Sequence, residues 1–155
     1  LDFDVDETGE TFYENALIKA RALNALCGKP AIADDSGLCV DALGGAPGVR
    51  SARYSGGNDN DNIVKLLGAL GGEENRKAYF ESCIVYYDGQ NIVRADGRAY
   101  GYICDVPRGE HGFGYDPVFM SDDLSKTFAE ATDDEKNAVS HRARALVELK
   151  RKLGI

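Results

Sequence analysis

Residues 31–38 are Ala31-Ile32-Ala33-Asp34-Asp35-Ser36-Gly37-Leu38, and we interpret the rest of the chain outward from them. The apolar run is too short for a helix and stops at two adjacent carboxylates. This pattern is typical of a buried strand that delivers acidic side chains to the edge of a sheet, where α/β proteins often carry their chemistry. Asp, Ser and Gly are also ordinary turn residues, so the same segment fits a simple surface turn.

Length and composition predict a single globular domain over residues 1–155. Of the 155 residues, 43% are hydrophobic and 9% aromatic, which is ordinary for a folded protein. The formal net charge of −8 argues against a general nucleic-acid binder, since that function needs many Lys and Arg contacts on one surface. A small anionic substrate fits this charge if a metal ion and a few local cations outweigh it.

The four cysteines are far apart and form no Cys-x-x-Cys pair, so they predict neither a zinc site nor a redox motif. We expect them to be buried, reduced thiols of a cytoplasmic protein. No apolar run approaches the roughly 20 residues of a membrane span, and the acidic first residues are unlike a signal peptide. The chain is therefore expected to be soluble, without a membrane partner.

An amphipathic helix is predicted from Phe12 to Cys27, because Thr11 begins a capping box and apolar residues recur at helical spacing. On this helix Asn15 and Lys19 are four residues apart and share one face. In the sequence, one turn and one short predicted strand separate this helix from Asp34 and Asp35. A solvent-exposed helix lysine is the simpler interpretation of Lys19.

Further elements follow the acidic stretch. Asn58 or Asp59 caps a second predicted helix. Two antiparallel strands, 77–87 and 91–106, are predicted around a hairpin turn at Asp88-Gly89. The glycine-rich segment before the second helix lacks the order of a Walker loop, so it does not predict a P-loop.

Two later segments carry candidate binding residues. Residues 112–117 hold aromatics between glycines, which suits stacking on a flat ligand as well as it suits a structural turn. The last helix is predicted from Thr132 to Leu153 as one element. Lys136 lies in its first turn, where the helix dipole disfavours a cation, and it is therefore a candidate for function.

Five motifs occur in a fixed order. They are Thr11-Phe12-x-Glu14-Asn15-Ala16-x-x-Lys19-Ala20, Asp34-Asp35-Ser36-Gly37-Leu38, Gly44-Gly45-x-Pro47-Gly48, Gly112-Phe113-Gly114-Tyr115-Asp116-Pro117 and Lys136-Asn137-x-x-Ser140-His141-Arg142. The set resembles the inosine triphosphatase family of noncanonical purine nucleoside triphosphate pyrophosphatases, and five ordered motifs are far more specific than any one. The resemblance implies an α/β fold in which a long mixed twisted sheet, flanked by helices, forms two lobes around a nucleotide cleft. It also implies a homodimer.

The activity implied by this resemblance is Mg²⁺-dependent hydrolysis of ITP, dITP or XTP to the monophosphate and pyrophosphate. Glu7 is then expected to be a Mg²⁺ ligand. Asp35 would orient or deprotonate the attacking water and contact the metal, with Asp34 in a metal-binding or supporting role. Successive strand residues point to opposite faces, so one of the two acids should dominate. Lys19 and Lys136 would hold the phosphate chain as point charges.

The resemblance also implies the residues that bind the purine. Phe113 is expected to stack on the base. Hydrogen-bond donors of His141 and Arg142 would bind the 6-keto oxygen of the base and would disfavour the amino group of adenine. The remaining substrate-binding residues implied are Ser36, Gly114, Tyr115, Asp116 and Ser140.

The family normally begins with a strand, a Thr/Ser-x-Asn-x-x-Lys phosphate-binding loop and a helix, and none of these precedes Leu1. The sequence is therefore expected to be N-terminally incomplete. One alternative is a family member that binds nucleotide or dimerises without turnover. Another is a haloacid-dehalogenase-like phosphatase, because Asp4-Val5-Asp6-Glu7-Thr8 matches its Asp-x-Asp-x-Thr motif, although the apolar strand that should precede the motif is missing.

Overall fold

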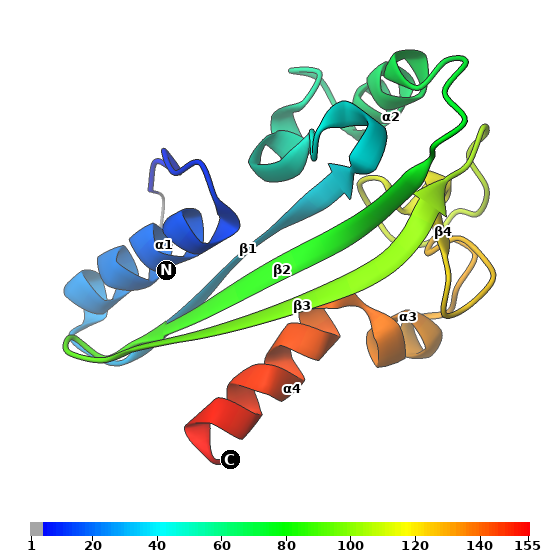
Figure 1. The fold of residues 1–155 in the computed structure, drawn as a ribbon. Helices are drawn as coiled ribbons and strands as arrows, with labels where there is room; N and C mark the ends of the chain where they lie inside the picture. The colour runs from blue at the N-terminus through cyan, green and yellow to red at the C-terminus, as the bar shows by residue number, and fades with distance from the viewer. Residues whose placement is uncertain (1–4) are drawn as a thin grey trace.

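A computed structural model describes residues 5–155, and its centre is a four-stranded sheet with strand order β1-β2-β3-β4 (Figure 1). In chain order the elements are α1 (Phe12–Cys27), β1 (Ala31–Val40), the 3-10 helices η1 (Asp41–Leu43) and η2 (Gly48–Arg53), α2 (Asp59–Ala69), β2 (Lys77–Tyr87), β3 (Ile92–Ile103), η3 (Asp116–Val118), β4 (Phe119–Ser121), α3 (Asp133–Val139) and α4 (His141–Leu153). Asp4, the nucleophile of the phosphatase alternative, lies outside the described residues.

Helices flank both faces of the sheet, which confirms the predicted α/β class. Helix α1 packs on one face of β1 and β2, and α4 packs on the opposite face of β2 and β3 (Figure 1). All neighbouring strands of the described sheet pair antiparallel. The family resemblance implied a mixed sheet, and in the described residues the sheet is purely antiparallel. For β2 and β3 the reason is local, because the tight connection between them reverses the chain.

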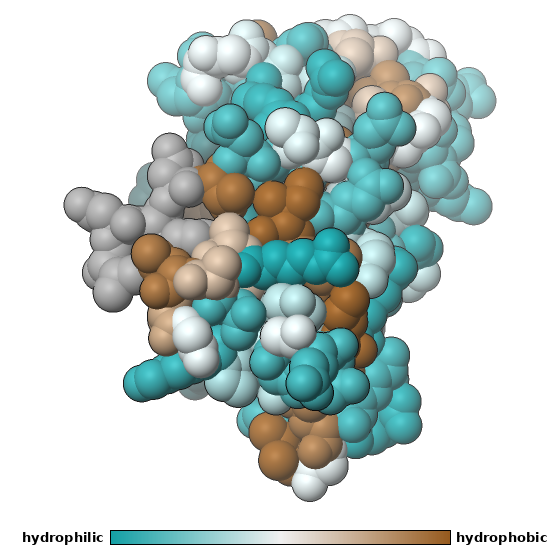
Figure 2. Space-filling view, turned by 90° about the vertical axis from the view of Figure 1, so that its left-hand side faces the viewer, coloured by the Kyte–Doolittle hydropathy of each residue, from teal (hydrophilic) through white to brown (hydrophobic). Residues whose placement is uncertain are grey.

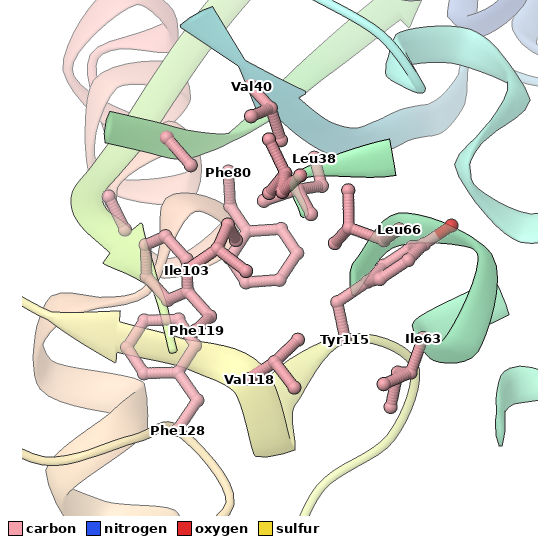
Figure 3. Close-up of a cluster of buried hydrophobic side chains, with 13 residues drawn as sticks. Leu38, Val40, Ile63, Leu66, Phe80, Ile103, Tyr115, Val118, Phe119 and Phe128 are labelled. Carbon is pink, nitrogen blue, oxygen red and sulfur yellow. The ribbon is translucent and has the colours of Figure 1, made fainter. Parts of the chain in front are cut away.

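The larger core lies at the end of the sheet beside α2. Phe80 packs against Phe119 and Phe128, with ring centroids 4.6 and 5.8 Å apart (Figure 3). Leu66 and Ile63 of α2 close this core from the other side. These contacts anchor β2, β4 and α2 to one another, and the loop between β3 and β4 is held beside them.

Three predicted boundaries are wrong. The strand predicted over 91–106 is β3, which ends at Ile103. Strand β1 does not stop at the acids, because Asp35 pairs with Cys83 and the ladder continues to Val40. The predicted C-terminal helix is two helices, α3 and α4. Ser140 separates them with an extended backbone (ψ 156°), and its hydroxyl accepts the Ala143 N–H to cap α4.

The surface at the α1 end of the molecule is mainly hydrophilic, with hydrophobic residues in several small patches (Figure 2). Within residues 5–155, no helix combines the length and the hydropathy of a membrane span.

Candidate active site

The first part of the site is a carboxylate–lysine cluster made by Glu7, Lys19 and Asp35. The Lys19 ammonium lies 2.6 Å from Glu7 Oε1 and 3.8 Å from Asp35 Oδ1. Asn15 Nδ2 donates to the other Asp35 oxygen at 3.3 Å. The predicted shared face of α1 is therefore the face that contacts the acidic stretch, and Lys19 is not a free surface lysine.

The environment of Asp35 favours uptake of a proton. Burial raises the pKa of the Asp35 carboxyl above its ordinary value, while the Lys19 ammonium and the Asn15 amide act in the opposite direction. A general base works best when its pKa lies closer to the operating pH than that of a free carboxylate does. Burial thus gives the Asp35 carboxylate a higher proton affinity than that of a free carboxylate.

Asp34 does not join the cluster. It lies on the opposite face of β1, where its Oδ2 accepts from Arg142 Nη2 at 2.9 Å. The cause is strand alternation, which sends neighbouring side chains to opposite faces. Asp34 therefore lies on the wrong face of β1 to share a metal ion with Glu7 and Asp35.

The second part of the site is a cavity of about 200 Å³ on the other face of β1, which we call the aromatic pocket. It begins at Ser36 and Gly37, directly beside Asp35 in the strand. The cavity is lined by Ser36, Gly37, Leu38, Ser51, Ala52, Asp59, Asn62, Phe80, Phe113, Gly114, Tyr115, Asp116, Lys136 and His141. Asp35 and the first lining residues of the pocket are thus consecutive in β1, which is an edge strand of the described sheet.

An ion pair and an exposed ring form one wall of the aromatic pocket. Lys136 Nζ lies 2.6 Å from Asp116 Oδ2 and 4.6 Å from the centre of the Phe113 ring. The Phe113 side is open, since 68% of this residue is exposed. Burial raises the pKa of Asp116, and the hydrogen bond from Lys136 opposes that effect. An aromatic face beside a cation suits a flat, electron-rich ring.

Lys136 does not join Lys19 in the carboxylate–lysine cluster. It projects from α3 into the aromatic pocket, whereas Lys19 lies on the α1 face of the sheet. Ser140 and Arg142 also lie outside the pocket lining. Ser140 is used as the α4 cap, and Arg142 is used to pair with Asp34.

His141 forms another part of the pocket lining. Its ring stacks on Phe80 with centroids 4.9 Å apart, and its Nδ1 is buried without a hydrogen-bond partner. Burial, together with the charges of Arg142 and Lys136, lowers the pKa of His141 to about 4. The ring is therefore neutral at pH 7, with one nitrogen able to donate and the other able to accept.

The His141 pKa predicts a pH-dependent stability. The unfolded residue has a pKa near 6.5, so the unfolded state binds more protons as the pH falls from 6.5 to 4. This favours unfolding, and the free energy of unfolding should fall by about 2 kcal/mol between pH 7 and pH 5 from this group. Urea titrations at pH 7 and pH 5 measure the free energy of unfolding of wild type and of His141→Gln. The control is His111→Gln, which changes an exposed histidine. Equal pH slopes in wild type and His141→Gln would contradict this assignment.

Sequence reasoning predicted Tyr115 as a binding residue but missed the pocket residues Ser51, Asp59 and Asn62. Tyr115 is buried and donates its hydroxyl proton to the Ser51 carbonyl at 2.6 Å. Asp59, expected only as a helix cap, accepts the Gly114 N–H at 3.0 Å. Asn62 lines the same wall. The two hydrogen bonds join segments that are distant in sequence. The sequence feature that could have indicated these residues is the polar first turn of α2.

Glu7 and Asp35 could hold a divalent metal ion together. Mg²⁺ in proteins usually takes one or two carboxylates and completes its shell with water and substrate phosphates. Glu7 and Asp35, both in contact with Lys19 Nζ, supply two such carboxylates. Residues 5–155 contain no group of three or more His, Cys, Asp or Glu side chains that would form an all-protein cage. The donor set thus suits an ion shared with a phosphate ligand.

Fold and site together define an α/β protein with an acidic, lysine-bearing cluster beside an aromatic pocket. The chain belongs to the Ham1 family, whose sequence pattern matches residues 1–152. This confirms the resemblance drawn from the five ordered motifs.

Individual relatives agree with this assignment. The chain is 50% identical over 155 residues to the dITP/XTP pyrophosphatase of Bacillus subtilis (strain 168), an alignment that covers 97% of this chain and 78% of the relative. It is 52% identical to the enzyme of the same name from Geobacillus kaustophilus (strain HTA426), covering 96% and 78%. Its fold matches the Staphylococcus aureus Ham1 protein with a TM-score of 0.94 at 44% identity, covering 99% and 81%.

Proposed function

We propose that this protein is a Mg²⁺-dependent pyrophosphatase that hydrolyses dITP, ITP and XTP to the nucleoside monophosphate and pyrophosphate. The observation that carries the proposal is the position of Asp35, which lies beside Lys19 and next to the residues that begin the aromatic pocket. The name dITP/XTP pyrophosphatase of the half-identical relatives supports the same reaction.

Asp35 performs the proton chemistry in this proposal. Its carboxylate orients or deprotonates the water that hydrolyses the bond between the α and β phosphates. Two donors fix that carboxylate, because Lys19 contacts Oδ1 and Asn15 contacts Oδ2. Holding the water and the phosphate in one geometry lowers the entropic part of the barrier.

The phosphate chain lies over the carboxylate–lysine cluster. Glu7 and Asp35 would hold the metal, and a bound Mg²⁺ neutralises charge on the phosphates. Lys19 supplies a further positive charge from α1. Its ammonium already bridges the two carboxylates, so substrate charge is met by a cation held in place before binding.

The base occupies the aromatic pocket. Phe113 stacks on the purine. Lys136 Nζ lies over the Phe113 ring at the pocket wall. Neutral His141 offers one ring N–H to the 6-keto oxygen. An adenine amino group would place a donor against that donor, and such a mismatch can discriminate by about 10⁴-fold in favourable cases.

Phosphorus NMR of the products tests the reaction. Wild-type protein is incubated with Mg²⁺ and dITP, XTP, GTP or ATP, and pyrophosphate should appear first from dITP and XTP. Orthophosphate as the first product would contradict cleavage between the α and β phosphates. Equal rates with ATP would contradict the proposed base selectivity. Nucleotide binding without any product would favour the alternative of a binding protein without turnover.

Asp59 is predicted to set the position of the stacking loop. Its carboxylate accepts the Gly114 N–H from across the aromatic pocket, one residue after Phe113. Removing one such bond costs about 1 kcal/mol, so Asp59→Ala should raise the KM for dITP about fivefold with a smaller change in kcat. Asp59→Asn keeps an acceptor and should recover most of the loss. Asn60→Ala serves as the control, and an unchanged KM in Asp59→Ala would refute this role.

The homodimer implied by the family resemblance stays a prediction. Sedimentation equilibrium of the whole chain measures it directly, and a single species of about 33 kDa is expected from two copies of the 16.7 kDa chain. A species at the mass of one chain across the concentration range would contradict it.

A further inference from the structure

Asn15 is the most deeply buried polar residue of α1, with 1% of its surface exposed. Its side chain makes three contacts. Oδ1 accepts the Gly9 N–H at 2.8 Å, and Nδ2 donates to the Gly9 carbonyl at 3.5 Å and to Asp35 Oδ2 at 3.3 Å. A buried amide with its donor and acceptor groups both occupied joins these segments in one geometry.

The Gly9 contact fixes the segment that carries Glu7. Gly9 lies so close to α1 that an added Cβ would come within 2.6 Å of Glu14 Cβ and 2.8 Å of Asn15 Oδ1. The next residue, Glu10, donates its N–H to Glu14 Oε2 at 2.7 Å. The chain is therefore held against the first turn of α1 only two residues after Glu7.

The Asp35 contact fixes the orientation of the carboxylate. Asn15 and Lys19 lie on consecutive turns of α1, and each contacts a different oxygen of Asp35. With one donor on each oxygen, rotation of the carboxylate about χ2 would break at least one contact. Oδ1 is the oxygen beside Lys19, and Oδ2 is the oxygen bound by the Asn15 amide.

We propose that Asn15 is a positioning residue that holds the Asp35 carboxylate and the Glu7 segment in a single arrangement around Lys19. An amide is required for this role. A carboxylate at position 15 keeps an acceptor for the Gly9 N–H but places a negative charge against Asp35, and alanine loses all three contacts. This inference rests on the proposed pyrophosphatase function for its kinetic consequence.

The experiment compares Asn15→Ala, Asn15→Asp and the control Asn24→Ala in the whole chain. Asn24 is a half-buried α1 residue outside the cluster, and its Nδ2 donates to the Lys29 carbonyl just beyond the end of the helix. Two quantities are measured: hydrogen exchange of the Gly9 amide by NMR, and kcat and KM for dITP with Mg²⁺.

In Asn15→Ala the Gly9 amide should exchange at least about tenfold faster, and kcat should fall by roughly 10- to 100-fold with little change in KM. Asn15→Asp should protect Gly9 nearly as well as wild type yet lose kcat to a similar extent. Asn24→Ala should match wild type in both. Retained kcat in Asn15→Asp would reduce Asn15 to a structural anchor and overturn the proposal, as would unchanged Gly9 exchange in Asn15→Ala. A wild type that releases no pyrophosphate overturns the proposed function instead, and the exchange measurement still decides the arrangement.

Discussion

Replacing Asp35 by asparagine is expected to reduce kcat for dITP by about 10³-fold, within the range found when a general base is removed. The substitution changes shape very little but removes the group that accepts a proton. The fold should not suffer, because a partly buried carboxylate whose pKa is raised by burial is replaced by a neutral amide. Pyrophosphate release under saturating Mg²⁺ and dITP measures the effect, and thermal unfolding checks the fold.

Asp34→Asn is the matched control, since it changes the neighbouring carboxylate on the opposite face of β1. The Asp34–Arg142 pair is exposed, and pairs of that kind contribute about 0–1 kcal/mol. A loss below tenfold is expected. If Asp34→Asn abolished turnover while Asp35→Asn remained active, the catalytic assignment would belong to the other acid.

Local signals were sufficient for the helices and strands that have strong boundaries. Helix α1 begins after Thr11 and ends at Gly28, whose left-handed backbone (φ 67°) closes the last turn, and both signals are local in sequence. Strand β2 also matched its predicted limits. The break at Ser140 was missed because helical periodicity continues across it, and only the extended backbone and the hydroxyl cap reveal it.

The candidate site was predictable only in part. Alternation along β1 predicts that Asp34 and Asp35 face opposite ways, but the choice between them depends on which face α1 covers. The position of Lys136 depends on its ion pair with Asp116, twenty residues away in sequence. The bond from Gly114 to Asp59 spans 55 residues. Such contacts come from packing between elements, which periodicity does not describe.

Replacing Lys136 by methionine should lower the free energy of unfolding by about 3 kcal/mol at pH 7.5. The reason is the partner that remains, since Asp116 is only 3% exposed and Lys136 Nζ lies 2.6 Å from its carboxylate. Methionine is an unbranched side chain like the apolar stem of lysine, and it removes the ammonium that lies over the Phe113 and Phe128 rings. Urea unfolding measures the change, and the KM for dITP should rise in the same variant.

Two comparisons separate loss of the ion pair from general damage to the fold. Without Lys136 the raised pKa of Asp116 rises further, so this carboxyl takes up a proton as the pH falls and the destabilisation should shrink at pH 5. The double variant Lys136→Met with Asp116→Asn removes the buried charge and should recover most of the lost stability. If the double variant is as unstable as the sum of the two single variants, the pair is not coupled and the argument from an unpaired buried carboxylate fails.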